Sequence, residues 1–143
     1  MKSIKDILAQ RSGVYTVKAG TTIKASVDYM ASQNIGIVPV LSEDGKLLGV
    51  FSEGDLVKRV IAKNLPLEST LVEDVMTKDL ILADIGESTQ ECLVKMKNKN
   101  TRHIIVIEGE KLAGILSMRD LLQIDLKISE ETIEILHNYI YAK

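Results

Sequence analysis

Two pairs of a serine and an aspartate, each spaced by three residues, are the parts of this sequence best suited to hold a ligand. Ser52 and Asp55 form the first pair, and Ser117 and Asp120 form the second; each pair follows a short apolar run and precedes a helical pattern. A carboxylate at such a junction can accept hydrogen bonds from two vicinal hydroxyl groups, as acidic residues do with ribose in other nucleotide-binding folds. We therefore predict that both aspartates can accept hydrogen bonds from the hydroxyl groups of a sugar.

The same spacing also has a purely structural explanation. A serine at a helix N-cap with an acid three residues later is a variant of the capping box. Aspartate is shorter than the Glu or Gln that usually closes this box, and the combination occurs at both matching positions. We therefore expect the two roles to coexist, with the serine capping the helix and the aspartate binding.

The second pair has more positive charge around it than the first. When the two halves are aligned, three potentially basic residues of the second half match small or apolar residues of the first: Arg119 matches Gly54, Arg102 matches Gly36, and His103 matches Ile37, while Met118 matches Glu53. Free N–H groups and the helix dipole favour a phosphate at a helix N-terminus, and an arginine adds a bidentate donor. We predict a nucleotide phosphate site at Asp120, and a weaker, neutral-ligand or empty site at Asp55.

These basic residues have ordinary explanations as well. Arg119 in the first turn of a helix can simply be solvated, and Arg102 stands at the edge of a loop. His103, next to Ile104 and Ile105, can be a satisfied structural histidine. Met30, Met96 and Cys92 have the helical spacing of core residues, and we assign them no chemistry.

Two similar series of elements must position these residues. Apolar spacing and caps predict helices over 4–10, 22–34, 53–62, 72–76, 88–97 and from Met118, and strands over 14–17, 37–41, 47–51, 80–83, 103–107 and 112–116. Pro39 inside the second strand predicts an edge position or a local break in pairing. Shifts of 66 and then 65 residues superpose the two halves, so each is a β-α-β-β-α unit.

The repeats predict three regions and a mixed α/β (α+β) fold. The first repeat with its N-terminal linker helix covers 1–63, the second covers 68–127, and the break at 64–66 separates them. A unit near 60 residues is marginal alone, so two units should share a core. Apolar spacing over 128–143 predicts an amphipathic helix with Ile133, Leu136 and Ile140 on one stripe. Its own domain or a second subunit could cover this stripe.

Composition excludes several classes of function. The net charge of −2 gives no field that would attract nucleic acid or an anionic membrane, and 3% aromatic residues without tryptophan argue against stacking platforms. One cysteine and two histidines give no recognisable metal site. The sequence has no apolar run long enough to span a membrane, no signal peptide and none of the common catalytic motifs. We expect a cytoplasmic protein that is not an enzyme, with no catalytic residue, no metal and no obligatory cofactor.

The doubled junction, an apolar Gly-h-h-Ser-x-x-Asp pattern ending each β-α-β-β-α unit, resembles the CBS-domain pair, or Bateman module. The resemblance covers about residues 4–126 and implies two repeats packed as a pseudo-twofold disc, with two related clefts. Such modules typically bind adenosine-containing ligands and regulate another protein. The resemblance therefore implies AMP, ADP or ATP as a regulatory ligand.

The resemblance also implies residues from the partner repeat in each cleft. The cleft of Asp120, Ser117, Arg119, His103 and Arg102 would be completed by Gly13, Val14, Tyr15, Ile35, Gly36 and Ile37. The weaker cleft of Asp55 and Ser52 would use Leu80, Ile81, Leu82 and Thr101. Small and apolar residues suit an adenine face, whereas Tyr15 departs from the usual small residue and could stack on the base or fill the pocket.

Three functional hypotheses remain open at this point. The first is a stand-alone sensor of adenine nucleotides that signals through repeat orientation or dimer changes to an unidentified effector protein; we expect a homodimer. The second is a scaffold or interaction protein with vestigial clefts. The third, a small nucleotide hydrolase, has no motif to support it. Within the first, S-adenosylmethionine or a dinucleotide remains an alternative ligand.

Overall fold

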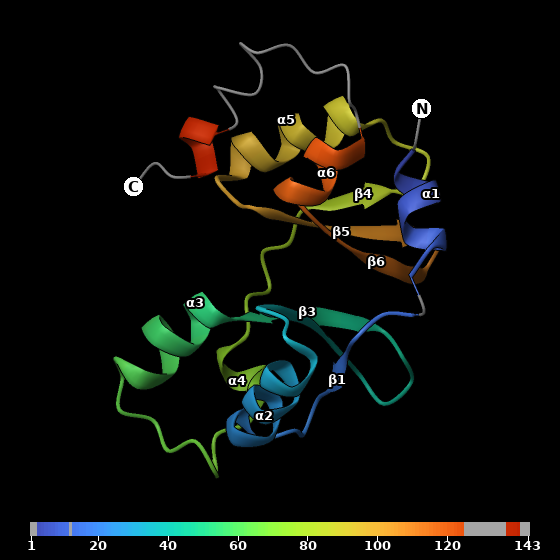
Figure 1. Cartoon of the computed structure of the whole chain (residues 1–143). Coiled ribbons are helices and arrows are strands. Elements are labelled where there is room, and N and C mark those ends of the chain that lie inside the picture. Colours follow the sequence, from blue (N-terminus) through green and yellow to red (C-terminus); the bar gives the residue numbers. More distant parts are fainter. Residues whose placement is uncertain (1–2, 12, 125–136, 141–143) are drawn as a thin grey trace. The chain divides into compact units, whose positions relative to one another are not determined.

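The computed structural model describes residues 3–11, 13–124 and 137–140 of the chain (Figure 1). The contacts divide the chain into two compact units. One unit is Tyr15–Leu80, and the other joins Met1–Val14 to Ile81–Lys143. Each unit contains a three-stranded sheet with helices, so the mixed α+β class predicted from the sequence is confirmed.

The unit Tyr15–Leu80 holds most of the first repeat. Its elements are β1 (Val17–Lys18), α2 (Ile23–Gln33), β2 (Ile37–Leu41), β3 (Leu47–Ser52), α3 (Glu53–Asp55), the π-helix η1 (Leu56–Ile61) and α4 (Val72–Val75). The sheet order is β1-β2-β3, with β1 parallel and β3 antiparallel to the central β2. Thr22 caps α2 by accepting the Ala25 N–H at 3.1 Å, and buried Ile23 and Met30 from this helix join Phe51 in the core.

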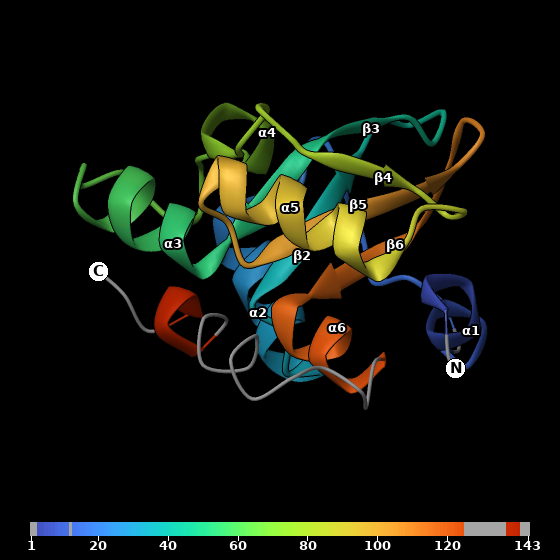
Figure 2. The ribbon, with the colours of Figure 1, turned by 90° about the horizontal axis from the view of Figure 1, so that it is seen from above.

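The other unit repeats this arrangement and carries the N-terminal helix. Its elements are α1 (Ile4–Ala9), β4 (Leu82–Asp84), α5 (Thr89–Lys99), β5 (His103–Glu108), β6 (Lys111–Ser117) and α6 (Met118–Ile124). The sheet order is β4-β5-β6, again parallel and then antiparallel. Figure 2 shows α5 beside α6. Cys92 and Met96 of α5 are fully buried, so the core role predicted for them is confirmed.

Each unit takes the helix that precedes the other repeat in sequence. In one unit α1 packs on β6, where a Cβ on Gly114 would lie 2.7 Å from Leu8 Cδ2. In the other, the chain after α4 packs on β3, where a Cβ on Gly49 would lie 2.6 Å from the Thr77 carbonyl oxygen. Glycine at these matching positions therefore allows a close approach in both units, to backbone at Gly49 and to a side chain at Gly114.

Pro39 explains why β1 is shorter than the predicted strand over 14–17. Val50 exchanges backbone hydrogen bonds with Thr77, at 2.9 and 2.8 Å, and so faces away from β2. Its antiparallel partner Pro39 must then present its backbone nitrogen toward the β1 side, where proline has no N–H to donate. Pairing with β1 begins one residue later, at Val17 with Val40. The predicted edge position is wrong, since β2 is central, but the break in pairing is confirmed.

Two other segments differ from the sequence expectation or lie partly outside the described residues. The helix predicted over 53–62 widens into the π-helix from Leu56, with the Ala62 N–H donating to the Val57 carbonyl at 2.9 Å; nothing in the sequence predicts this. Of the predicted tail helix 128–143, residues 128–136, including Ile133 and Leu136, and 141–143 lie outside the described residues. Residues 137–140 are helical, and Tyr139 and Ile140 pack against the core that contains Met96. Among the described residues, no helix is both long and apolar enough to cross a bilayer.

Candidate functional site

Asp120 closes a complete capping box at the start of α6. The Ser117 N–H donates to Asp120 Oδ2 at 2.8 Å, and the Asp120 N–H donates to Ser117 Oγ at 3.1 Å. The first repeat has the same pair of bonds, at 3.0 and 3.2 Å between Ser52 and Asp55. The predicted capping by both serines is therefore confirmed, and the box also holds one carboxylate oxygen of the aspartate in each copy. Any ligand role falls to the other oxygen.

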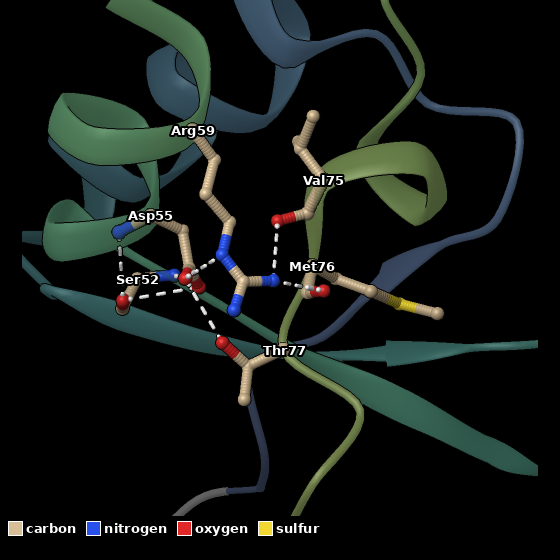
Figure 3. Close-up of polar contacts among 6 residues, drawn as sticks. All are labelled: Ser52, Asp55, Arg59, Val75, Met76 and Thr77. Carbon is tan, nitrogen blue, oxygen red and sulfur yellow. Dashed lines mark hydrogen bonds and ion pairs between the residues drawn. The ribbon is translucent and has the colours of Figure 1, made fainter. Parts of the chain in front are cut away.

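In Asp55 that other oxygen is already occupied (Figure 3). The Thr77 hydroxyl donates to Asp55 Oδ1 at 2.9 Å, and Arg59 Nε lies 3.6 Å from the same oxygen. The Asp55 side chain is 9% exposed. Within the described residues, both carboxylate oxygens of Asp55 thus have partners, and the residue joins α3 to the segment after α4.

In Asp120 the other oxygen, Oδ1, has no hydrogen-bond donor among residues 3–11, 13–124 and 137–140. Arg11 Nη2 lies 3.0 Å from Asp120 Oδ2, the oxygen that also accepts the Ser117 N–H. No described residue donates a hydrogen bond to Oδ1 of Asp120, and its side chain is 24% exposed, well above the 9% of Asp55. The second copy therefore offers a carboxylate oxygen that can accept hydroxyl donors from a ligand.

The difference between the two aspartates begins with one residue in the preceding linker. Counted from the buried first residue of each helix, Ile4 in α1 and Val72 in α4, Ala9 stands where Thr77 stands. Alanine has no hydroxyl to donate. The matching position in the second copy therefore has no hydroxyl to donate to Asp120, whose Oδ2 instead lies near Arg11 of the same segment.

The predicted basic residues surround this end of the β5-β6 pair. His103 at the start of β5 lies directly opposite Ser117 at the end of β6. The Met118 N–H donates to the Arg102 carbonyl at 2.9 Å, which ties the start of α6 to the start of β5. Arg102 and Arg119 are exposed, as expected of residues that could reach an anion or water. The structure thus places Arg102, His103, Ser117 and Arg119 at one end of the β5-β6 pair.

The matching end of the first repeat has the opposite charge. Ile37 lies opposite Ser52, and the Glu53 N–H donates to the Gly36 carbonyl at 3.0 Å. A Cβ on Gly36 would lie 3.0 Å from a carboxylate oxygen of Glu53, so that acid covers the start of the strand. An anion at this place would meet a carboxylate where the second repeat offers arginine.

The remaining predicted residues are divided between the two units. Gly13, Val14, Ile81, Leu82 and Thr101 belong to the unit of Asp120, whereas Tyr15, Ile35, Gly36, Ile37 and Leu80 belong to the other. Tyr15 is 45% exposed and meets the ring of Tyr29 edge-on, with centroids 6.3 Å apart. Each predicted cleft that draws on both units stays a prediction.

Sequence reasoning missed three residues whose contacts are distant in sequence: Thr77 at Asp55 in one unit, and Arg11 at Asp120 and Tyr139 at Thr101 in the other. The Tyr139 hydroxyl donates to the Thr101 carbonyl at 3.0 Å and also to the carbonyl of Met96. Thr101 directly precedes Arg102, which is the residue before β5. None of these contacts follows a local spacing rule, so no periodic pattern could have found them.

Cys92, the single cysteine of the chain, is a poor candidate for chemistry. Burial raises the pKa of its thiol to about 11, which leaves almost no reactive thiolate near neutral pH. Across residues 3–11, 13–124 and 137–140, no three His, Cys, Asp or Glu side chains are grouped as a metal site would need. The chemistry that the described site supports is hydrogen bonding and charge pairing with a ligand.

Two tandem units, each with a Ser-x-x-Asp junction between its last strand and the helix that follows it, define a paired-repeat α+β protein. A family model for the CBS domain matches residues 4–62 and 72–127, and the chain belongs to the CBS-domain family. It is 34% identical over 135 residues to the uncharacterised protein YlbB of Bacillus subtilis, covering 94% of this chain and 86% of that protein.

Solved structures agree with this assignment. The CBS-domain protein ATU1752 from Agrobacterium tumefaciens is 31% identical, with a TM-score of 0.77 over 85% of this chain and 91% of that one. The CBS-domain protein PAE2072 from Pyrobaculum aerophilum, solved as a complex with AMP, shares the fold at 21% identity, with a TM-score of 0.75 over 96% of this chain and 99% of that one. The predicted family and fold class are confirmed.

Proposed function

We propose that this protein senses an adenine nucleotide, AMP, ADP or ATP, and that Asp120 reads the ribose. The observation that supports this most directly is the open Oδ1 of Asp120, in contrast to the occupied Oδ1 of Asp55. Because the capping box holds Oδ2, the carboxylate presents Oδ1 in a fixed direction. Oδ1 is therefore preorganised to accept from a sugar hydroxyl. The AMP complex of PAE2072 is consistent with this ligand class.

Arg102 and Arg119 supply the proposed contacts to phosphate. Both are exposed, and Arg119 lies in the first turn of α6, where the helix dipole also favours an anion. Guanidinium groups pair with phosphate through charge-assisted hydrogen bonds. His103, opposite Ser117, is proposed to line the same site. In this proposal the adenine takes apolar cover around Val14, which belongs to the same unit as Asp120.

Signalling would follow from a difference in affinity between two arrangements of the repeats. A ligand shifts such an equilibrium only by as much as it binds one arrangement better than the other. The effector and a homodimer contact through which the shift could pass belong to the same proposal. Neither is needed for the binding test.

A thermal-shift panel of AMP, ADP, ATP, S-adenosylmethionine, NAD and adenosine, followed by calorimetry, tests the ligand proposal. A ligand at about 100 times its dissociation constant should stabilise the protein by roughly 2.7 kcal/mol, or several degrees for a chain of this size. Asp120→Asn should remove the shift, because the amide replaces an acceptor oxygen and the negative charge.

The matched control for Asp120→Asn is Glu91→Gln. Glu91 closes the capping box of α5 with Ser88 in the same unit and is not part of the proposed site. Its variant should keep the ligand shift. Absence of any shift in the wild-type protein across the panel would reject the proposal and favour an interaction module with vestigial clefts.

A further inference from the structure

Arg11 joins the N-terminal segment to the proposed site. Its Nη2 lies 3.0 Å from Asp120 Oδ2, and its Nη1 donates to the Ile115 carbonyl at 2.7 Å. Two acceptors from the β6-α6 junction therefore fix the guanidinium beside the carboxylate. The side chain is 38% exposed, and guanidinium has more N–H donors than these two contacts use.

We propose that Arg11 is a specificity-determining residue of the Asp120 site, which makes the site favour phosphorylated nucleosides over uncharged ones. This inference rests on the proposed function, because it concerns the same site. It adds a third arginine, from the N-terminal segment, to the two that the sequence comparison of the repeats identified.

The first argument is electrostatic. Asp120 carries the negative charge that would repel a phosphate bound nearby, and Arg11 compensates it at 3.0 Å. With that charge compensated, Arg102 and Arg119 can act on the phosphate unopposed. A unit charge within about 8 Å, at an effective dielectric constant near 20 and with partial screening by salt, changes anion affinity by roughly fivefold to tenfold.

The second argument concerns the two carboxylate oxygens. Oδ2 of Asp120 accepts from the Ser117 N–H and faces Arg11, so a ribose hydroxyl finds its place on Oδ1. Removal of Arg11 frees acceptor capacity on Oδ2 and takes a cation from the site. An uncharged nucleoside should then bind as well as before or better, while a nucleotide should bind more weakly.

The first repeat contains a matched control. Arg59 lies 3.6 Å from Asp55 Oδ1 and donates to the Met76 carbonyl at 2.9 Å, so it also links an aspartate to a backbone oxygen. It comes from the helix that follows Asp55, and that aspartate is saturated by Thr77. Loss of Arg59 should not change the discrimination between ligands.

The experiment compares wild type, Arg11→Met, Arg11→Lys and Arg59→Met by calorimetric titration with AMP and with adenosine at low and high salt. Methionine keeps the length and apolar stem of the side chain. The ratio of AMP affinity to adenosine affinity should fall by about fivefold or more in Arg11→Met at low salt. The difference should shrink at high salt because screening weakens the charge. Arg11→Lys should retain most of the ratio, and Arg59→Met should retain all of it.

Other outcomes overturn the inference in distinguishable ways. Equal weakening of AMP and adenosine in Arg11→Met, with an unchanged ratio, would show that Arg11 only positions Asp120. An unchanged affinity for both would show that it has no part in binding. If the wild-type protein binds neither ligand, the proposed function fails and this inference fails with it. A melting curve for each variant shows whether it is folded.

Discussion

The Thr77 hydroxyl donates to Asp55 Oδ1 at 2.9 Å, and this bond distinguishes two junctions that are otherwise alike. Both aspartates close a capping box, and both have an arginine nearby. Thr77 completes the hydrogen bonding of Asp55, which makes it part of the framework. At the matching position Ala9 has no hydroxyl, and no described residue donates to Oδ1 of Asp120. The two junctions thus differ in whether the second carboxylate oxygen has a partner among the described residues.

Thr77→Val should destabilise the protein without affecting ligand binding at Asp120. The substitution keeps the shape of the side chain but leaves Asp55 Oδ1, in a side chain that is 9% exposed, without its hydroxyl donor. Loss of a donor to a largely buried charged group costs about 1–3 kcal/mol. Urea denaturation measures this cost.

Ser69→Ala is the control for Thr77→Val, because it also removes a hydroxyl group from the linker between the repeats. Ser69 is exposed, and its replacement should change the free energy of unfolding by less than about 0.5 kcal/mol. Equal stability of the two variants would mean that the bond between Thr77 and Asp55 contributes nothing measurable.

Gly49→Ala should be more damaging than Gly114→Ala, although the two glycines match in the repeats. A Cβ on Gly49 would lie 2.6 Å from the Thr77 carbonyl oxygen, which belongs to the backbone. A Cβ on Gly114 would lie 2.7 Å from Leu8 Cδ2, at the end of a flexible side chain that can move. Overpacking against backbone costs about 1–3 kcal/mol, and thermal unfolding of the two variants should show this order.

Leu8→Ala provides a test of the mechanism for Gly114→Ala. If the clash with Leu8 is the cause, the double variant should be less destabilised than the sum of the two single variants. No such rescue is expected for Gly49→Ala, since no side-chain change removes the Thr77 carbonyl. Additive losses at Gly114 and Leu8 would contradict this account.

The repeats made most of the fold predictable, because duplicated apolar spacing and caps specify elements twice. Ser52 and Ser117 were identified as caps for this reason, and Asp120 was preferred over Asp55 from the basic residues aligned with it. That preference stays a prediction, but the contacts that distinguish the two aspartates could not be read from the sequence. They come from Thr77 and Arg11, which lie 22 and 109 residues from the aspartates they contact. Contacts between such distant residues depend on tertiary packing, and a local periodic pattern does not predict them.

The short β1 had a signal in the sequence that was interpreted only in part. Pro39 was expected either to lie at an edge or to interrupt pairing. The choice between these depends on which way the backbone nitrogen of Pro39 points. That direction is set by Val50, which pairs with Pro39 on one side and exchanges hydrogen bonds with a second residue on the other. The second residue is Thr77 of the linker, and its contact with Val50 joins residues that are distant in sequence.

Glu87 and Lys95 should make the stability of their unit depend on acid pH. Lys95 Nζ lies 2.7 Å from Glu87 Oε1, and its hydrogen bond, together with one from the Asp84 N–H, lowers the pKa of Glu87 below its ordinary value of 4.5. A lowered pKa in the folded state contributes stability above pH 4.5, and this contribution is lost as the pH falls through the folded-state pKa. Unfolding free energies between pH 3 and 7 should show this loss in wild type, and Lys95→Met should reduce it. Lys97→Met on the same helix is the control, and an equal pH dependence in the two variants would rule out the pair as the cause.

Tyr139 should hold the C-terminal residues to the site through its neutral hydroxyl. The hydroxyl donates to the carbonyls of Thr101 and Met96, and burial raises its pKa above 10.0 despite the opposing effect of the bond to Thr101. Because the raised pKa belongs to the folded state, the contribution is complete below about pH 10 and is lost as the pH rises through the folded-state value.

Tyr139→Phe should therefore cost about 1 kcal/mol of stability at pH 7, the usual net value of such a bond, and the difference from wild type should shrink at strongly alkaline pH. Since Thr101 precedes Arg102 and His103, the variant should also weaken AMP binding modestly while leaving the capping box at Ser117 intact. Tyr29→Phe is the control, because Tyr29 belongs to the other unit and its ring contact with Tyr15 is kept by phenylalanine. If Tyr139→Phe and Tyr29→Phe have the same stability at every pH, the described contacts of Tyr139 do not fix the start of β5.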